Sequence, residues 1–133
     1  MTVKVLVTTD GSNLSDKAVE SAVALAKALD AHLVGVTAVL APPPAAGFQA
    51  EDQAVRDRLA AVARKAEESG VDCEVVAEHS DAVWKAILEC AARLDVDYIV
   101  MASRGLGSIG SFLLGSETQK VLHQADRPVL VVR

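Results

Sequence analysis

The chain has 133 residues, of which 51% are hydrophobic and 3% aromatic, with a formal net charge of −5. Its length and apolar content predict one folded domain, residues 1–133, and exclude a disordered chain. The acidic balance and the lack of a basic cluster argue against nucleic acid or an anionic membrane as a partner. Without a membrane-length apolar run, a signal-peptide layout or a CxxC pair, we expect a cytosolic protein.

The first part of the chain predicts a β-α-β unit. Val3–Val7 is a short aliphatic run, typical of a parallel strand that is buried on both faces. Ser15 is the predicted N-cap of a helix, because apolar residues then recur at helical spacing: Ala18, Ala22, Leu25 and Leu29. The run His32–Leu40 returns to the composition of a strand.

The middle of the chain predicts a loop, a helix and a strand. Ala41–Ala50 contains Pro42, Pro43 and Pro44, which exclude a helix or a central strand. A second helix follows and ends at Gly70, with an inward face of Val55, Leu59, Val62 and Ala66. The run Asp72–Ala77 predicts the third strand.

The last part predicts two helices and two strands. Ser80 is a candidate cap for a third helix with the buried face Val83, Ile87, Cys90 and Leu94. Tyr98–Ala102 reads as the fourth strand, and Pro128–Val132 as the fifth. Between these strands, Ser116 begins a short helix with Val121 and Leu122 inward.

This alternation predicts an α/β fold, a doubly wound five-stranded parallel sheet with helices on both faces. Right-handed crossovers and the commonest strand order, 3-2-1-4-5, make the first and fourth strands neighbours. A crevice then opens at their carboxyl ends. The polar segments Thr8–Ser12 and Ser103–Gly115 are expected to meet there.

The stretch from Val100 to Thr118 combines a strand, a glycine-rich loop and a helix start, which together present backbone N–H groups to a phosphate. Gly105–Gly110 matches G-x-G-x-x-G. A dinucleotide fingerprint should, however, open a helix at once and be followed by an acidic residue after the next strand, where this chain has Arg133. A Walker P-loop is also excluded, because the chain has no Gly-Lys-Ser/Thr.

A different spacing is more informative. Gly105, nine intervening residues and then Gly115-Ser116 resemble the G-x2-G-x9-G-S/T nucleotide motif of universal stress proteins. The resemblance covers essentially the whole chain, since Val5–Ser12, Asp97–Gly105 and Pro128–Val132 resemble that family's first, fourth and closing strands. It implies an adenine nucleotide alpha hydrolase-like fold that binds ATP, or ADP or AMP, with Mg²⁺ or Mn²⁺.

The resemblance also implies the site residues. Gly105, Gly115, Ser116 and Thr118 would hold the phosphates and ribose, with Arg104 adding positive charge. Thr9 and Asp10 would lie near the adenosine, and Ala38 and Val39 would flank the adenine. The remaining members of the implied site are Thr8, Met101, Ala102 and Glu117.

One position departs from the motif, because Ala102 stands where its first glycine would be. If that position requires a positive φ or close backbone contact, alanine weakens binding; if it is the last extended residue of the fourth strand, alanine fits.

Several of these residues have simpler interpretations. Asp10 could simply close a turn or cap the first helix, and Ser116–Gln119 reads as a capping box that needs no ligand. Trp84 is expected to be partial core. The histidines lack metal-ligand spacing and are expected at element ends: His32, His79 and His123.

Two functions from different classes follow. One is a nucleotide-binding stress or signalling module without efficient catalysis, slow ATPase activity being a weaker variant. The other is a dimeric interaction protein of the same fold that uses no nucleotide, for which Ala102 argues. In both, we expect a homodimer through Pro128–Val132, an apolar strand at a sheet edge that no later segment covers.

Overall fold

The computed structural model describes residues 2–40, 52–105 and 114–133. The predicted loop at Ala41–Ala50 and most of the glycine-rich segment, residues 106–113, lie outside the described residues. The elements, in chain order, are β1 (Lys4–Thr8), α1 (Asn13–Leu29), β2 (His32–Val39), α2 (Gln53–Glu68), β3 (Cys73–His79), α3 (Val83–Leu94), β4 (Tyr98–Ala102), α4 (Ser116–Gln124) and β5 (Val129–Val132). Within the described residues, no helix is long and apolar enough to cross a membrane.

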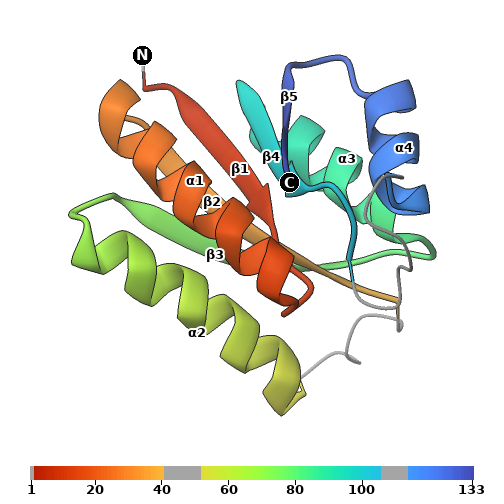
Figure 1. Ribbon diagram of the computed structural model, residues 1–133, viewed down its shortest axis with the longest axis horizontal. Helices are drawn as coiled ribbons and strands as arrows, with labels where there is room; N and C mark the ends of the chain where they lie inside the picture. The colour runs from red at the N-terminus through yellow and green to blue at the C-terminus, as the bar shows by residue number, and fades with distance from the viewer. Residues whose placement is uncertain (1, 41–51, 106–113) are drawn as a thin grey trace.

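The strands form one five-stranded sheet in the order β3-β2-β1-β4-β5, and all of its pairs are parallel. This confirms the predicted fold and strand order. Figure 1 shows α1 and α2 on one side of the sheet and α3 and α4 on the other. The central position of β1 and β4 makes their carboxyl ends the point at which the chain reverses direction across the sheet.

The core consists of two clusters, one on each face of the sheet. Alternate residues of β1 divide between them: Val5 and Val7 pack with α1 and α2, and Leu6 packs with α3. The α2 helix approaches β2 closely, because a Cβ on Gly35 would lie 2.6 Å from Cγ1 of Val62. A strand buried on both faces explains the uninterrupted aliphatic run in the sequence.

Two predicted helix caps are wrong. The α1 helix begins at Asn13 because the Ser12 hydroxyl accepts the N–H of Ser15 at 3.2 Å, so Ser12 and not Ser15 is the N-cap. The α3 helix begins later than Ser80 predicts. Its N-cap is Ala82, which makes no side-chain cap hydrogen bond.

The predicted capping box at Ser116–Gln119 is also absent. Gly115 is the N-cap of α4, so Ser116 is already inside the helix. The Gln119 amide instead donates to the Leu114 carbonyl at 2.8 Å. The prediction at Gly70 is better: this residue follows the end of α2 with φ 71°, the left-handed conformation that terminates helices.

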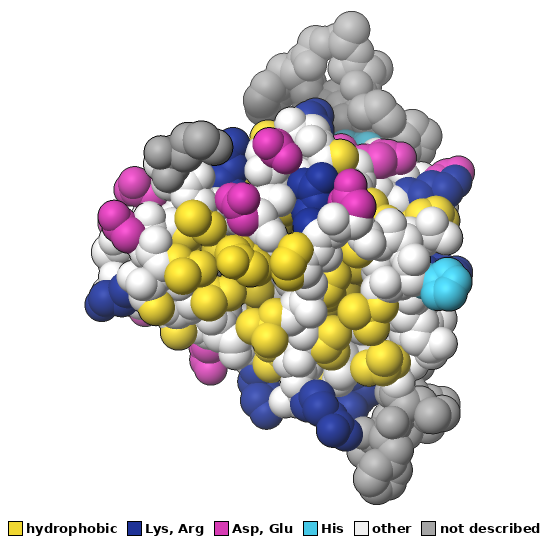
Figure 2. All heavy atoms as spheres, turned by 90° about the horizontal axis from the view of Figure 1, so that it is seen from above, with side chains coloured by type: hydrophobic (Ala, Val, Ile, Leu, Met, Phe, Trp, Pro, Cys, Tyr) yellow, Lys and Arg dark blue, Asp and Glu magenta, His cyan; other side chains and the backbone are white. Residues whose placement is uncertain are grey.

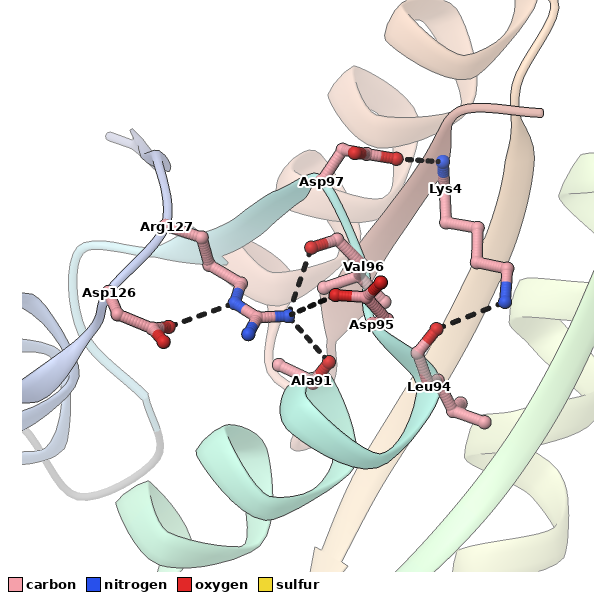
Figure 3. A network of polar contacts seen from close by, with 8 residues as sticks. All are labelled: Lys4, Ala91, Leu94, Asp95, Val96, Asp97, Asp126 and Arg127. Atoms are coloured by element: carbon pink, nitrogen blue, oxygen red, sulfur yellow. Dashed lines mark hydrogen bonds and ion pairs between the residues drawn. The ribbon is translucent and has the colours of Figure 1, made fainter. Parts of the chain in front are cut away.

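An arginine fixes the amino end of β5 against the end of α3 (Figure 3). Nη1 of Arg127 donates to the carbonyls of Ala91, at 2.7 Å, and Val96, at 3.0 Å. Its Nε contacts Asp126 at 3.0 Å, and this hydrogen bond lowers the pKa of the Asp126 carboxyl. The Ala91 carbonyl also accepts the N–H of Val96 at 3.1 Å, so Arg127 adds charged hydrogen bonds to a helix end that is already capped by the backbone.

Candidate functional site

A cavity of about 220 Å³ opens at the carboxyl ends of β1 and β4. It lies where the sequence predicted the crevice. Its described lining residues are Thr8, Asp10, Ser15, Val83, Ile87, Met101, Ala102, Arg104, Gly105, Gly115, Ser116, Glu117 and Thr118. The structure therefore brings together ten residues of the thirteen that the family resemblance implied.

One wall of the cavity is polar and comes from the loops after β1 and β4. Oδ1 of Asp10 accepts the N–H of Ser12 at 2.9 Å, which closes the turn into α1. Its Oδ2 lies against Gly105, where a Cβ would be 2.1 Å away. The half-buried Arg104 and the exposed Ser116 complete this wall. The glycine at 105 thus leaves space for a carboxylate of the neighbouring loop.

The start of α4 is tied to the end of β4 by two hydrogen bonds. The Gly115 N–H donates to the Ser103 carbonyl at 2.7 Å, and the buried Thr118 hydroxyl donates to the Ala102 carbonyl at 2.9 Å. These two donors position the helix. A helix leaves the N–H groups of its first turn without intrahelical acceptors, so Ser116–Thr118 offers backbone donors at the cavity.

Part of the lining is apolar, and two of its residues, Val83 and Ile87, were not predicted as site residues. Val83 and Ile87 of α3 reach the cavity beside Met101 of β4. Helical spacing did predict that Val83 and Ile87 face inward. It could not show that the first turn of α3 extends to the carboxyl ends of the strands. Ser15, also missed, lines the cavity although it is only 3% exposed.

The other predicted site residues lie elsewhere. Thr9 is buried; its carbonyl accepts the Thr37 hydroxyl at 2.8 Å, and its own hydroxyl lies 3.1 Å from Oγ of Ser15. Ala38 and Val39 are half-buried at the end of β2, and neither is among the described lining residues. Thr9 thus stabilises the β1–α1 turn through buried hydrogen bonds.

Glu117 connects two helices at the rim of the cavity. Its Oε2 accepts the backbone N–H of Trp84, in the first turn of α3, at 3.0 Å. Glu117 itself belongs to the first turn of α4. The carboxylate thus takes over the capping role that was predicted for Ser80. The signal is not local, because Glu117 follows Trp84 by 33 residues.

A model of the universal stress protein family matches residues 1–133. The chain belongs to this family. A universal stress protein of Thermus aquaticus is 36% identical over 133 residues, with 97% of each sequence covered. A solved universal stress protein in complex with cAMP is 28% identical, with a TM-score of 0.80 over 98% of this chain and 97% of that one. A third, from Archaeoglobus fulgidus, is 17% identical with a TM-score of 0.81 over 100% of both chains, which shows the fold alone.

The family resemblance left the effect of Ala102 open, and the structure shows the conformation of that residue. Ala102 is the last residue of β4 and pairs with Val132 of β5. Among the described non-glycine residues, only Asp30 and Asp95 have positive φ. An alanine in an extended strand carries no backbone strain, so the positive-φ alternative does not apply, and an effect through close backbone contact stays a prediction.

The cysteines and histidines of this universal stress protein lie outside the cavity lining. Burial raises the pKa of the Cys90 thiol to about 11, and burial also raises the pKa of Cys73. Both thiols are therefore protonated and weakly nucleophilic near neutral pH. His32, His79 and His123 lie at or next to element ends, as predicted, and the described residues contain no group of three metal-binding side chains.

Proposed function

We propose that this universal stress protein binds an adenine nucleotide, ATP or its relatives ADP and AMP, in the cavity between β1 and β4. The observation that carries the proposal is a cavity lining divided between apolar side chains and polar groups, the latter at a helix start. A nucleotide has the same division, with a flat base at one end and phosphates at the other. The complex of a 28% identical relative with cAMP supports the same ligand class.

Each wall has a role in this proposal. The base lies against Val83, Ile87 and Met101, where its apolar faces leave water. The phosphates lie toward Arg104 and the first turn of α4, whose backbone N–H groups and partial positive charge favour an anion. The adenine-flanking role of Ala38 and Val39 stays a prediction. Mg²⁺ or Mn²⁺ would accompany a polyphosphate and share its negative charge, with Asp10 as the nearby carboxylate.

Calorimetry of the wild type and Gly115→Val tests this proposal. A Cβ at position 115 would lie 3.1 Å from Cα of Arg104, so a branched side chain forces the loop and the helix start apart. We expect wild-type protein to bind ATP, ADP or AMP and Gly115→Val to lose binding while keeping its far-ultraviolet spectrum. No heat with any of the three at millimolar concentration contradicts the proposal, and unchanged affinity in the variant contradicts the location.

We further propose that the protein is not an efficient enzyme. The sequence lacks a Walker lysine, and the described cavity lining contains no histidine or cysteine nucleophile. Phosphate release from ATP should therefore fall far below the ~1–100 s⁻¹ typical of kinases. A turnover within that range, lost in Asp10→Asn, would contradict this view and indicate an ATPase.

A homodimer through β5 is the proposed assembly. β5 is an edge strand, and Leu130 on it is 47% exposed. Figure 2 shows hydrophobic side chains gathered across the face seen from above, with mixed acidic and basic side chains along one border and basic ones along the other. An apolar edge with unpaired N–H and C=O groups favours pairing with another copy.

Sedimentation tests the assembly with a matched pair of substitutions. Leu130→Lys on β5 should yield monomers, whereas Val75→Lys on β3, the opposite edge, should stay dimeric; Val75 is 38% exposed. Wild-type monomers at tens of micromolar would contradict the interface. Dimers that bind no nucleotide would favour the alternative function, an interaction protein of the same fold.

A further inference from the structure

We propose that Glu117 determines the charge preference of this cavity and disfavours nucleotides with many negative charges. The inference rests on the proposed function and adds a specificity determinant to it. The Glu117 carboxylate supplies negative charge that the helix starts would otherwise attract from a bound anion. Its role would be to make the site favour a monophosphate over a free triphosphate.

The position of the carboxylate carries the first step. Glu117 is half-buried, lines the cavity and accepts the Trp84 N–H at 3.0 Å. The α3 helix has no acidic residue in its first turn and no side-chain cap from Ala82. Glu117 therefore lies where the amino ends of α3 and α4 meet. Two helix starts stabilise one negative charge there, so that charge is held in place.

The charge balance of the cavity carries the second step. The ionisable side chains among its described lining residues are Asp10, Glu117 and Arg104. Residues 106–113, which follow in the loop, include no ionisable side chain. The single guanidinium is thus outnumbered by carboxylates. The backbone N–H groups of α4 must attract a phosphate against the field of Glu117.

The consequence depends on the charge of the ligand. Coulomb repulsion by a fixed carboxylate grows with each negative charge brought close to it, and burial reduces its screening by salt. The carboxylate leaves the affinity for uncharged adenosine unchanged, lowers the affinity for AMP and lowers the affinity for free ATP most. Magnesium reduces the net charge of ATP, so Mg-ATP should be weakened less than free ATP.

The variant Glu117→Gln separates charge from structure. Glutamine keeps an oxygen that can accept the Trp84 N–H but removes the charge. By calorimetry at fixed ionic strength with EDTA, we expect adenosine affinity to stay within about twofold, AMP to bind about threefold tighter and ATP about tenfold tighter. With Mg²⁺ the gain for ATP should shrink. The control Glu89→Gln removes an exposed charge of α3 outside the described lining and should change none of these affinities.

Equal gains for adenosine, AMP and ATP, or no gain for any of them, would overturn the role of Glu117 while leaving nucleotide binding intact. Absence of binding by both proteins would overturn the proposed function, and this inference with it. Glu117→Ala also removes the hydrogen-bond acceptor of Trp84. It should lower the melting temperature below that of Glu117→Gln, which a purely electrostatic role would not do.

Discussion

Oδ2 of Asp10 lies so close to Gly105 that a Cβ added to this glycine would be 2.1 Å from it. The carboxylate of the β1–α1 loop and the backbone of the β4–α4 loop therefore fit together only without a side chain at position 105. Oδ1 of the same carboxylate accepts the Ser12 N–H at 2.9 Å, at the start of α1. One side chain thus couples both loops of the cavity.

Gly105→Ala should displace Asp10 and weaken its hydrogen bond to Ser12. We expect a loss of about 1 kcal/mol in the free energy of unfolding, in line with one weakened turn contact. Nucleotide affinity should fall about tenfold, because both loops move. Chemical denaturation and calorimetry measure the two effects.

The double variant Asp10→Ala/Gly105→Ala is the control. Without the carboxylate, the added methyl group no longer meets an obstacle, so Gly105→Ala should cost much less stability in the Asp10→Ala background. If its cost is the same in both backgrounds, the close approach of these residues does not matter for stability.

Arg127→Ala should destabilise the protein more than its position at a turn suggests. The side chain is 15% exposed and donates to two carbonyls at the end of α3 and the start of β4. Losing charged hydrogen bonds to these groups should cost about 2 kcal/mol in urea denaturation. Arg93→Ala removes an arginine that is 52% exposed and pairs with Glu78, and it should cost below about 1 kcal/mol. Equal costs for the two would contradict the specific role of Arg127.

Cys90 should make stability depend on pH in the alkaline range. Its pKa is raised to about 11 in the folded protein from an ordinary value of 9.0. Below pH 9 the thiol is protonated in both states, so its contribution to stability is fully present. Between pH 9 and 11 the unfolded chain releases the proton first, and up to about 2 kcal/mol of stability is lost. Subtracting the profile of Cys90→Ala isolates the contribution of this thiol; parallel profiles would contradict this origin.

Local sequence patterns predicted most of the fold. β4 was predicted with its observed ends, Tyr98 and Ala102, because an aliphatic run bounded by polar residues has one interpretation in a parallel sheet. The predicted strand order was the commonest one among the few topologies that right-handed crossovers leave. Errors came at helix starts such as Ser12 and Ala82, where several hydroxyl and small residues compete for the cap. The prediction that Leu122 faces inward was also wrong, because this residue is 40% exposed.

The residues that line the cavity were predicted where they are close in sequence and missed where they are not. The glycine spacing located Gly105, Gly115 and Ser116. By contrast, Val83 and Ile87 reach the cavity only because of where α3 lies along the sheet. Sequence periodicity does not specify that position. The Glu117 contact with α3 was missed for the same reason, since no local pattern joins it to Trp84.

Amide chemical shifts of ¹⁵N-labelled protein, titrated with AMP, test the central claim most directly, because they report binding and its location together. We expect saturable shifts in Asp10 and Gly11, in Arg104 and Gly105, in the first turn of α4 and in the first turn of α3. A second cavity, whose lining includes Arg58 and Lys65, also borders the β1–α1 loop. Apart from that loop, its lining residues should show no shifts. Shifts centred on Arg58 and Lys65, or no shifts at millimolar AMP, ADP and ATP, would contradict nucleotide binding between β1 and β4.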